Sequence, residues 1–288
     1  MLHADGLTSA LVRDEATGQE IGIGPETKVF RRQPAVPIPS SDSQRDAAVE
    51  SFISAQYRVA MNSLFTVDAV WMNSANKDRL LDQNKLFGAK LAREVGFSTI
   101  PTVLTDSPQT WRRFVKEWGS RGDLAVKPVG AWAAKLLGGE DDATMALFTT
   151  RLARREAEDL AEAVAHAPVL LQPYTEKAYE LRVTAVNDQL FACRIDSQNT
   201  SRTKTDWRRY DLANTPHAAW GLDESVSRQL QKFMTLAGLR YAAFDFIVTP
   251  SGETVFVEVN PAGQFGWIEE LSGLPISAAI ADWLLSSE

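Results

Sequence analysis

Length, composition and charge place the chain among ordinary globular proteins, with room for one large domain or two smaller ones. It has 288 residues, of which 44% are hydrophobic and 23% are charged, and this excludes collagen-like, coiled-coil and disordered chains. The formal net charge of −7 argues against binding of nucleic acid through an overall basic field. The single cysteine, Cys193, cannot close an intrachain disulfide, and no apolar stretch is long enough to span a bilayer. We therefore expect a protein of the reducing cytoplasm, without a nucleic-acid or membrane partner.

The front of the chain predicts short strands and then helices. Strands are expected at residues 10–13, 19–23 and 28–32, and a connector rich in proline and serine follows at residues 34–43. Apolar residues at helical spacing predict helices over residues 44–64 and 84–96, and a strand is expected between them at residues 67–73.

The rest of the chain alternates predicted hairpins with helices. Adjacent hairpins with interposed helices indicate an α+β fold with antiparallel strand pairs, and not a doubly wound parallel sheet. Neither a dinucleotide-binding glycine fingerprint nor a P-loop is present. The strands are expected at residues 99–104, 124–129, 170–174, 181–186, 190–195, 241–248 and 254–259, and the helices at 109–118, 144–164, 224–236 and 276–285.

Two acidic side chains are predicted to face each other on a hairpin near the C-terminus. If Ser251 and Gly252 form the turn, Asp245 pairs with Glu258, and Asn260 lies on the same face because side chains alternate along a strand. Facing carboxylates within apolar strands need a positive partner. Two carboxylates and an amide oxygen suit Mg²⁺, which completes its coordination with water and phosphate oxygens. The alternative is a solvated outer face that carries polar residues by chance.

Two lysines occupy positions where lysine is costly. Lys127 interrupts the apolar strand at residues 124–129, where an unpaired ammonium is expensive to bury. Lys85 begins the helix at 84–96, where the helix dipole disfavours a cation. A bound phosphate would favour both, although either lysine alone is typical of a surface residue with a buried stem. A glycine-bounded stretch at residues 130–139 could close over phosphates, or form an exposed loop.

In the order of these motifs the sequence resembles the ATP-grasp superfamily. The motifs are Asn84-Lys85, Val126-Lys127-Pro128, Leu171-Gln172-Pro173-Tyr174, Asp245, and Glu258-Val259-Asn260. Within that superfamily the chain is most similar to the microviridin-type peptide maturases (graspetide synthetases), which form side-chain ester or amide crosslinks in a ribosomally made precursor peptide. The closer match lies in Tyr179-Glu-Leu-Arg-Val183, residues 192–198, Asp206-Trp-Arg208 and residues 258–267, and the resemblance runs from about residue 29 to the C-terminus.

The resemblance implies a fold in which two α+β domains enclose ATP, and it implies roles for particular residues. Lys85 and Lys127 would contact the ATP phosphates, and Asp245, Glu258 and Asn260 would hold Mg²⁺. The remaining assignments are a hinge of Gln172, Pro173 and Tyr174 that holds adenine, Glu180 at the ribose hydroxyls, and Arg182, Arg194 and Arg208 facing the phosphate and the activated carboxylate.

The register of the hairpin at residues 181–195 decides whether two of these arginines lie together. A two-residue turn at Asn187-Asp188 pairs Arg182 with Cys193 and turns Arg194 to the other face. A three-residue loop puts both arginines on one face. We prefer the three-residue loop because it accounts for the resemblance, while an ordinary surface ion pair is the alternative for any one arginine.

The division of the chain follows the same resemblance. We expect a shortened N-terminal domain over residues 1–75, a central ATP-grasp subdomain with the phosphate-covering loop over 76–175, and a C-terminal subdomain with the metal and arginine site over 176–288. Related maturases carry a further strand–helix–strand stretch in front of the segment that matches residues 29–34, where this chain has only 28 residues. A leader-binding role of the N-terminal domain is therefore in question, unless the start codon has been set too late.

The function expected from the sequence is that of an ADP-forming ligase that uses ATP and Mg²⁺ to join side chains of a precursor peptide through an acyl phosphate. One rival is a glutamate ligase of the RimK-like type or a small-molecule carboxylate–amine ligase. A second rival is an inactive peptide- or nucleotide-binding module, against which Lys85, Lys127, Asp245, Glu258 and Asn260 all argue. A homodimer is expected by analogy.

Overall fold

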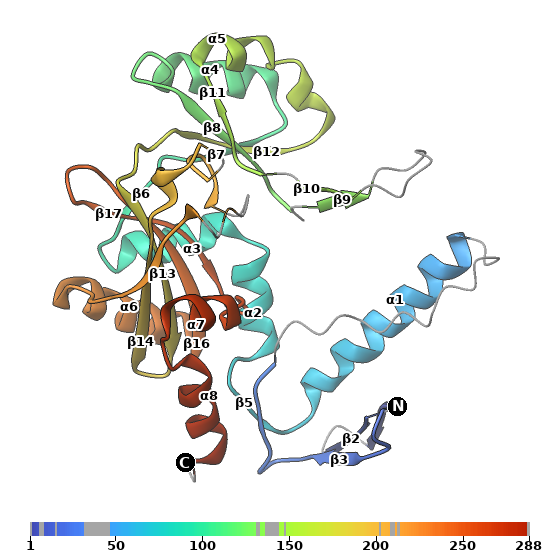
Figure 1. The fold of residues 1–288 in the computed structure, drawn as a ribbon. Helices are drawn as coiled ribbons and strands as arrows, with labels where there is room; N and C mark the ends of the chain where they lie inside the picture. Colours follow the sequence, from blue (N-terminus) through green and yellow to red (C-terminus); the bar gives the residue numbers. More distant parts are fainter. Residues whose placement is uncertain are drawn as a thin grey trace.

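The computed structural model describes residues 2–5, 9–14, 16–31, 47–130, 133–135, 144–146, 148–201, 203–207, 211 and 214–286. Two main β-sheets, one of six strands and one of four, form the framework, and smaller strand pairs and helices surround them (Figure 1). In the described part of the chain, no helix is long and apolar enough to cross a membrane.

The six-stranded sheet forms the C-terminal half of the molecule. Its neighbours pair antiparallel except β17 and β6, which run parallel. All eight residues of β16 are buried, as expected of a central strand covered on both faces. In spatial order the strands are β15 (His217–Trp220), β14 (Gln189–Ile195), β13 (Tyr179–Val186), β16 (Tyr241–Val248), β17 (Thr254–Asn260) and β6 (Ser98–Thr99).

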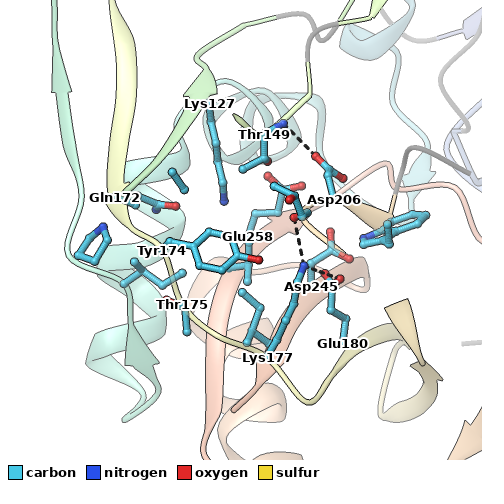
Figure 2. Close-up of a pocket in the computed structure, with 17 residues that line it drawn as sticks. Lys127, Thr149, Gln172, Tyr174, Thr175, Lys177, Glu180, Asp206, Asp245 and Glu258 are labelled. Atoms are coloured by element: carbon cyan, nitrogen blue, oxygen red, sulfur yellow. Dashed lines mark hydrogen bonds and ion pairs between the residues drawn. The ribbon is translucent and has the colours of Figure 1, made fainter. Parts of the chain in front are cut away.

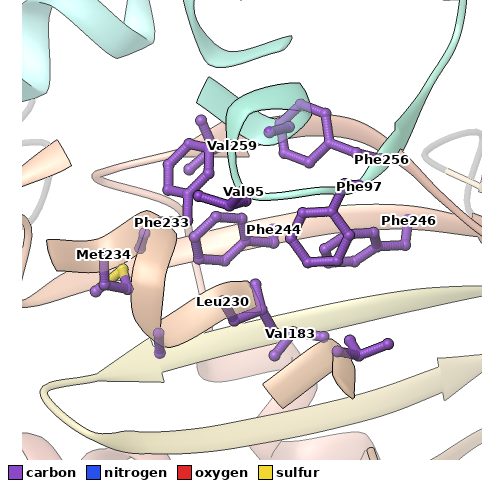
Figure 3. Close-up of a cluster of buried hydrophobic side chains, with 14 of the residues drawn as sticks. Val95, Phe97, Val183, Leu230, Phe233, Met234, Phe244, Phe246, Phe256 and Val259 are labelled. Atoms are coloured by element: carbon purple, nitrogen blue, oxygen red, sulfur yellow. The ribbon is translucent and has the colours of Figure 1, made fainter. Parts of the chain in front are cut away.

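One face of this sheet packs against helices α3 (Lys85–Glu94) and α6 (Glu224–Ala237). Phenylalanine rings fill the interface, and the ring of Phe244 lies edge-on to that of Phe233 with centroids 5.1 Å apart (Figure 3). Helices α7 (Gly266–Ser272) and α8 (Ile276–Leu285) cover part of the opposite face. The uncovered remainder of that face is the floor of the cleft described below.

The four-stranded sheet lies above the first (Figure 1). Helices α4 (Pro108–Trp118) and α5 (Arg154–Asp159) and the short 3-10 helix η2 (Ala163–His166) cover one of its faces, where the indole nitrogen of Trp111 donates to the carbonyl of Ala157 at 2.6 Å. Alternate residues on the other face point to the cleft. The strands are β11 (Thr150–Leu152), β8 (Leu124–Pro128), β12 (Val169–Pro173) and β7 (Val103–Thr105).

The N-terminal part is joined to the large sheet through Asn73. Its amide nitrogen donates to the carbonyls of Tyr241 and Pro261, and its amide oxygen accepts from the N–H groups of Arg240 and Tyr241. The elements of this part are β1 (Leu2–Asp5), β2 (Ser9–Arg13), β3 (Glu20–Ile23), β4 (Lys28–Val29), α1 (Ala47–Ser63), η1 (Leu64–Thr66), β5 (Val70–Trp71) and α2 (Ala75–Asp82). The first three strands form one antiparallel sheet, and β4 and β5 pair in parallel.

The predicted helix over residues 144–164 is wrong. The segment instead contains β10 (Thr144–Ala146), which pairs with β9 (Ala133–Lys135), then β11, and only then α5. Thr149 and Thr150 are β-branched and favour a strand, and β11 gains a complete partner in β8. The carboxylate of Glu156 accepts from the Ala153 N–H at 2.7 Å, which marks the true helix start.

The predicted strand at residues 99–104 is divided into β6 and β7, which pair in different sheets. Pro101 stands between them and has no N–H to offer a ladder. Elements α2, α7 and β15 were not predicted at all.

The packing also divides the predicted central subdomain at residues 76–175. Leu91, Ala92, Val95 and Phe97 belong to the core of the six-stranded sheet, because α3 packs on β17 and β6 extends that sheet. Within the segment, only the part from β7 onwards builds the four-stranded sheet.

Candidate active site

A cleft lies between the two main sheets, with an empty volume of about 630 Å³ (Figure 2). Seven of the residues singled out from the sequence line it, and they come from both sheets and from the segment that joins them. They are Lys127, Gln172, Pro173, Tyr174, Glu180, Asp245 and Glu258.

A β-bulge in β17 brings the two carboxylates to this cleft. Asp245 pairs with Glu258, as predicted, but Phe246 pairs with Phe256, so Val257 is an extra residue on β17. The predicted turn is one residue out, because Thr249 and Glu253 close the loop with a 3.0 Å backbone hydrogen bond. With strict alternation from Phe256, Glu258 would point into the phenylalanine core. The bulge lets Phe256 face the core while Glu258 faces the cleft.

Each carboxylate has a cationic partner. The guanidinium of Arg182 donates from Nη1 to Asp245 Oδ2 at 2.8 Å, and both side chains are largely buried. Lys85 Nζ lies 3.2 Å from Glu258 Oε2. Asn260 donates from Nδ2 to Asp245 Oδ2 at 3.2 Å, so the three predicted metal ligands lie together. The electrostatic repulsion expected between the carboxylates is offset by Arg182 and Lys85.

The donor set fits a hard divalent cation. Two carboxylates and a side-chain amide meet where the two strands pair, and all three offer the oxygen ligands that Mg²⁺ prefers. In the described residues no group of three or more His, Cys, Asp and Glu side chains is placed to hold a metal. A cation here would therefore keep positions open for water and for phosphate oxygens.

The two lysines expected at phosphates both lie near Glu258. Lys127 extends from β8 towards the carboxylates of the lower sheet (Figure 2). Lys85 is the first residue of α3, whose N-cap Asn84 accepts from the Phe87 N–H at 2.9 Å. Both lysines and Glu258 line a second, smaller cavity beside the cleft. Two cations and the N-terminus of a helix thus converge on one region.

The predicted hinge contributes one buried polar atom with no partner. Gln172 donates from Nε2 to Thr102 Oγ1 at 2.8 Å, and Thr102 in turn donates to the Ile100 carbonyl. Gln172 Oε1 is buried without a hydrogen bond, so a donor on a bound ligand would satisfy it. The Tyr174 N–H donates to the Asp123 carbonyl at 2.8 Å, and the guanidinium of Arg151 lies 4.0 Å from the Tyr174 ring centroid.

The preferred register of the hairpin between β13 and β14 is wrong. Arg182 pairs with Cys193 and Val186 with Gln189, so Asn187 and Asp188 form a two-residue turn. Arg194 therefore points to the opposite face, where Nε contacts Asp196 Oδ1 at 2.8 Å and the guanidinium lies 4.0 Å from the Tyr179 ring centroid. Arg194 does not reach the cleft. Asn187 has φ 53°, which asparagine tolerates better than most residues.

Two predicted parts of the site lie outside the residues that the structure describes. They are Arg208 and most of the glycine-bounded stretch at residues 130–139. Cys193 is fully buried in the core beneath α7 and α8, and burial raises the pKa of its thiol to about 11.

Several polar residues of the cleft were given no role from the sequence, although two of them, Ser197 and Asp206, lie in motifs of the resemblance. Lys177 contacts Glu180 and the carbonyl of Thr205, and Ser197 also donates to Glu180. Asp206 accepts at Oδ2 from the Thr149 N–H at 3.1 Å, which links the lower part of the site to the upper sheet. The sequence carries no periodic signal for these contacts, because Lys177, Thr205 and Asp206 lie in irregular segments. A lysine three residues before Glu180 is the only local sign.

Comparison with solved structures identifies the fold. The chain is similar to the macrocyclase MdnC from Microcystis aeruginosa MRC, bound with precursor peptide MdnA (24% identity, TM-score 0.83, 100% of this chain and 86% of that chain). It is also similar to a RiPP-associated ATP-grasp ligase of Chryseobacterium gregarium in complex with ADP, a leader and a core peptide (26%, 0.82, 99% and 83%). The chain has the ATP-grasp fold.

A third ATP-grasp structure is similar as well, namely the ligase PsnB complexed with a phosphomimetic variant of minimal precursor, Mg and ADP (21% identity, TM-score 0.70, 99% of this chain and 84% of that chain). No protein-family model and no curated protein sequence matches the chain. The resemblance to graspetide-type ATP-grasp maturases, expected from the sequence motifs, is confirmed at the level of structure. In this fold the cleft between the two sheets is the candidate nucleotide site.

Proposed function

We propose that the protein is an ADP-forming ATP-grasp ligase that joins a carboxyl side chain of a precursor peptide to a hydroxyl or amino side chain. The observation that carries this proposal is the bulged hairpin, which directs Asp245 and Glu258 into the cleft towards Lys127 on the opposite sheet. An inactive binding module would have no need for two carboxylates of this kind. The similar structures from Microcystis and Chryseobacterium contain precursor, leader or core peptides, which supports a peptide substrate.

Bound ATP with Mg²⁺ would supply the phosphoryl group that activates a peptide carboxyl as an acyl phosphate. We propose that Asp245, Glu258 and Asn260 hold the cation, and that Lys85 and Lys127 neutralise phosphate charge. The hinge formed by Gln172, Pro173 and Tyr174 would receive adenine, with the unpartnered Gln172 Oε1 accepting from its amino group.

On the same proposal, Glu180 accepts from the ribose hydroxyls, and Arg182 and Arg208 stabilise the acyl phosphate and the oxyanion that follows it. Arg182 already lies beside Asp245, where its Nη2 also donates to the Gln264 carbonyl at 3.2 Å. A hydroxyl or amine then displaces phosphate, so each crosslink costs one ATP and removes one water from the peptide. The proposal assigns positioning and charge stabilisation to the protein and names no general base.

The test is mass spectrometry of the peptide after incubation with the protein, ATP and Mg²⁺. The substrate is the short peptide encoded beside the gene, chosen for acidic and hydroxyl or amino residues. We expect its mass to fall by whole multiples of one water, with ADP and phosphate as the other products. A gain of a glutamyl residue would support the RimK-like rival, and an unchanged mass with no ATP consumption would support a binding module. AMP as the product would contradict the proposed chemistry.

We also propose that the protein forms a homodimer through the outer face of α1. Its polar face, with Arg58 and Asn62, lines a cavity against α2. Val49, Phe52 and Val59 lie on the outward stripe and are 47%, 64% and 63% exposed. An apolar stripe of this kind is normally covered. Light scattering would give twice the mass of 31.8 kDa for the dimer, and a monomer at micromolar concentration would refute it.

Three functional parts and a location complete the proposal. Residues 1–75 form the front, the upper sheet within 76–175 carries Lys127 and the hinge, and 176–288 carry the carboxylates and Arg182.

We propose that the protein works in the cytoplasm, where its single buried thiol stays reduced. Neither a nucleic acid nor a membrane is proposed as a partner, because the net charge of −7 gives no basic field.

A further inference from the structure

One oxygen of the Glu180 carboxylate is fully engaged by the protein. Lys177 Nζ contacts Glu180 Oε1 at 2.7 Å, and Ser197 Oγ donates to the same oxygen at 2.7 Å. The side chains of Lys177 and Glu180 are only 4% and 11% exposed. Two donors on Oε1 fix the plane of the carboxylate and leave Oε2 as its acceptor towards the cleft.

The ammonium of Lys177 makes a second contact, to the carbonyl of Thr205 at 3.2 Å. Thr205 belongs to the segment 203–207, which forms part of the cleft wall. In the same segment Asp206 accepts from the Thr149 N–H of the upper sheet, and the ring of Trp207 stacks on that of Trp267 at 4.6 Å between centroids. Lys177 therefore bridges a carboxylate of the lower sheet and a wall that touches the upper sheet.

The hinge residues and Asp206 lie on opposite sides of the cleft. Gln172 and Tyr174 lie on the left in Figure 2, Asp206 lies on the right, and Lys177 and Glu180 lie below them. With adenine at the hinge, the proposed function places the phosphates and the peptide carboxyl that they activate towards the side of Asp206. A buried ammonium that binds both a carboxylate and a loop carbonyl has two rigid partners, and loss of either leaves a buried polar group unpaired.

We infer that Lys177 is a positioning residue that couples nucleotide binding to peptide binding: it aligns Glu180 for the ribose hydroxyls and, through the same ammonium, fixes the 203–207 wall on the peptide side. The inference rests on the proposed function and specifies which residue links its two ligands. When a ribose hydroxyl donates to Glu180 Oε2, the carboxylate and Lys177 are held more firmly, and so is the wall. Thermodynamic reciprocity requires that peptide binding in turn strengthens nucleotide binding by the same factor.

The first experiment compares ATP with 2′,3′-dideoxy-ATP in calorimetric binding to the wild type, Lys177→Met and Ser197→Ala. Methionine keeps the length of the side chain and removes the charge. We expect Lys177→Met to weaken ATP binding about tenfold, the loss of one hydrogen bond to a charged group, and to leave dideoxy-ATP binding unchanged. Ser197→Ala should weaken ATP binding in the same selective way but less. Equal weakening of both nucleotides, or no weakening, would overturn the inference.

The second experiment measures the coupling itself, using ADP so that no turnover occurs. In the wild type, saturating precursor peptide should tighten ADP binding several-fold. Lys177→Met should abolish this gain, whereas Ser197→Ala should keep it, because the Thr203 hydroxyl of the 203–207 segment donates to the backbone carbonyl of Ser197, which alanine retains. A gain that survives in Lys177→Met would contradict the coupling role.

Two controls keep the tests decisive. Circular dichroism melting shows whether each variant folds, and if Lys177→Met does not, Lys177→Gln replaces it, since an amide N–H can still reach one partner but not carry the charge. Lys177→Arg should restore most of the preference for ATP over dideoxy-ATP. If the wild type binds no nucleotide at all, the proposed function fails. If it binds ATP and dideoxy-ATP equally, only the role of Glu180 and Lys177 fails.

Discussion

Two hairpins of the same sheet supply the site, and they differ in how their register is set. In the hairpin of β16 and β17 a loop closed by Thr249 and Glu253 is followed by a bulge at Val257, and the bulge restores the pairing of Asp245 with Glu258. In the hairpin of β13 and β14 the ladder runs without interruption from a two-residue turn. In the first hairpin the bulge within β17 determines which side chains face the cleft. In the second hairpin the length of the turn alone determines it.

The difference shows what determines which side chains face the cleft. The regular hairpin sends Arg182 to the cleft and Arg194 away from it, because alternation is strict once the turn length is fixed. The bulged hairpin places Val257 and Glu258 at the cleft in succession. A carboxylate that faces the cleft can therefore lie two residues after a core phenylalanine, as Glu258 does after Phe256, only where a bulge resets the alternation.

The largest effect is expected from the bulged hairpin. Glu258→Gln removes one negative charge from the proposed cation site at constant size, and turnover should fall by at least about 100-fold. Steady-state formation of ADP at several Mg²⁺ concentrations measures it. The control is Glu253→Gln, an exposed carboxylate at the loop of the same hairpin that accepts from Ser98 and should leave turnover unchanged. Full activity of Glu258→Gln would refute the metal site.

The regular hairpin offers a matched pair of arginines on its two faces. Arg182→Met leaves Asp245 buried without its guanidinium, so the free energy of unfolding should fall by roughly 3–5 kcal/mol and turnover should be lost. Arg194→Met removes a partly exposed ion pair and the contacts with the rings of Tyr179 and Trp220, at a cost of about 1 kcal/mol or less, and should leave turnover intact. Urea unfolding and the ADP assay measure both effects. Loss of turnover in stable Arg194→Met would contradict the register.

The sequence predicted those elements whose signals are local. Strand β16 and helix α8 have the predicted bounds, Tyr241–Val248 and Ile276–Leu285, because each is a continuous or periodic apolar run. The pairing of Asp245 with Glu258 was predicted correctly from an incorrect turn. The bulge escaped prediction, since nothing in Val255-Phe256-Val257 distinguishes a bulge from a straight strand until the core and the cleft are both known.

Other parts of the site depend on tertiary partners. Lys177 lies in an irregular segment and binds Glu180 at the start of β13 and the carbonyl of Thr205 in another irregular segment, so no spacing rule could reveal it. The preference for a three-residue loop between β13 and β14 came from the expected role of Arg194, and the chemistry of the turn residues outweighed that expectation. The sequence thus predicted that the proposed metal ligands lie together, and it did not reveal Lys177 beside Glu180.

A smaller effect is expected at the turn of the regular hairpin. Asn187 has φ 53° and its N–H donates to the Arg240 carbonyl at 2.7 Å. Asn187→Val places a β-branched residue in the left-handed region and should lower the free energy of unfolding by about 1–2 kcal/mol. Asn187→Gly keeps that conformation accessible and should be nearly neutral. Urea unfolding compares the two, and an equal stability of both variants would show that the turn does not constrain the register.

The smallest effect concerns the strand that flanks the regular hairpin. His217 of β15 pairs with Ile195 of β14, and burial lowers the pKa of its imidazole below the ordinary value of 6.5. In the folded protein the ring resists protonation, whereas in the unfolded chain it accepts a proton near pH 6.5. Its contribution to stability is therefore present above about pH 6.5 and is lost as the pH falls below it. His217→Gln should remove this loss.

Asp78 titrates in the same pH range, and its contribution to stability changes with pH in the opposite direction. The pH dependence of the wild-type stability alone therefore cannot reveal the contribution of His217. Burial raises the pKa of Asp78 from 3.8 to about 6, and its contribution is present below pH 3.8 and is lost as the pH rises through 6. The measurement is the difference in unfolding free energy between His217→Gln and the wild type, taken at about pH 7.5 and about pH 5.5. Because Asp78 is common to both proteins, its contribution cancels. The stability of the variant relative to the wild type should rise as the pH falls, and a constant difference would show that β15 does not hold a neutral histidine beside the hairpin.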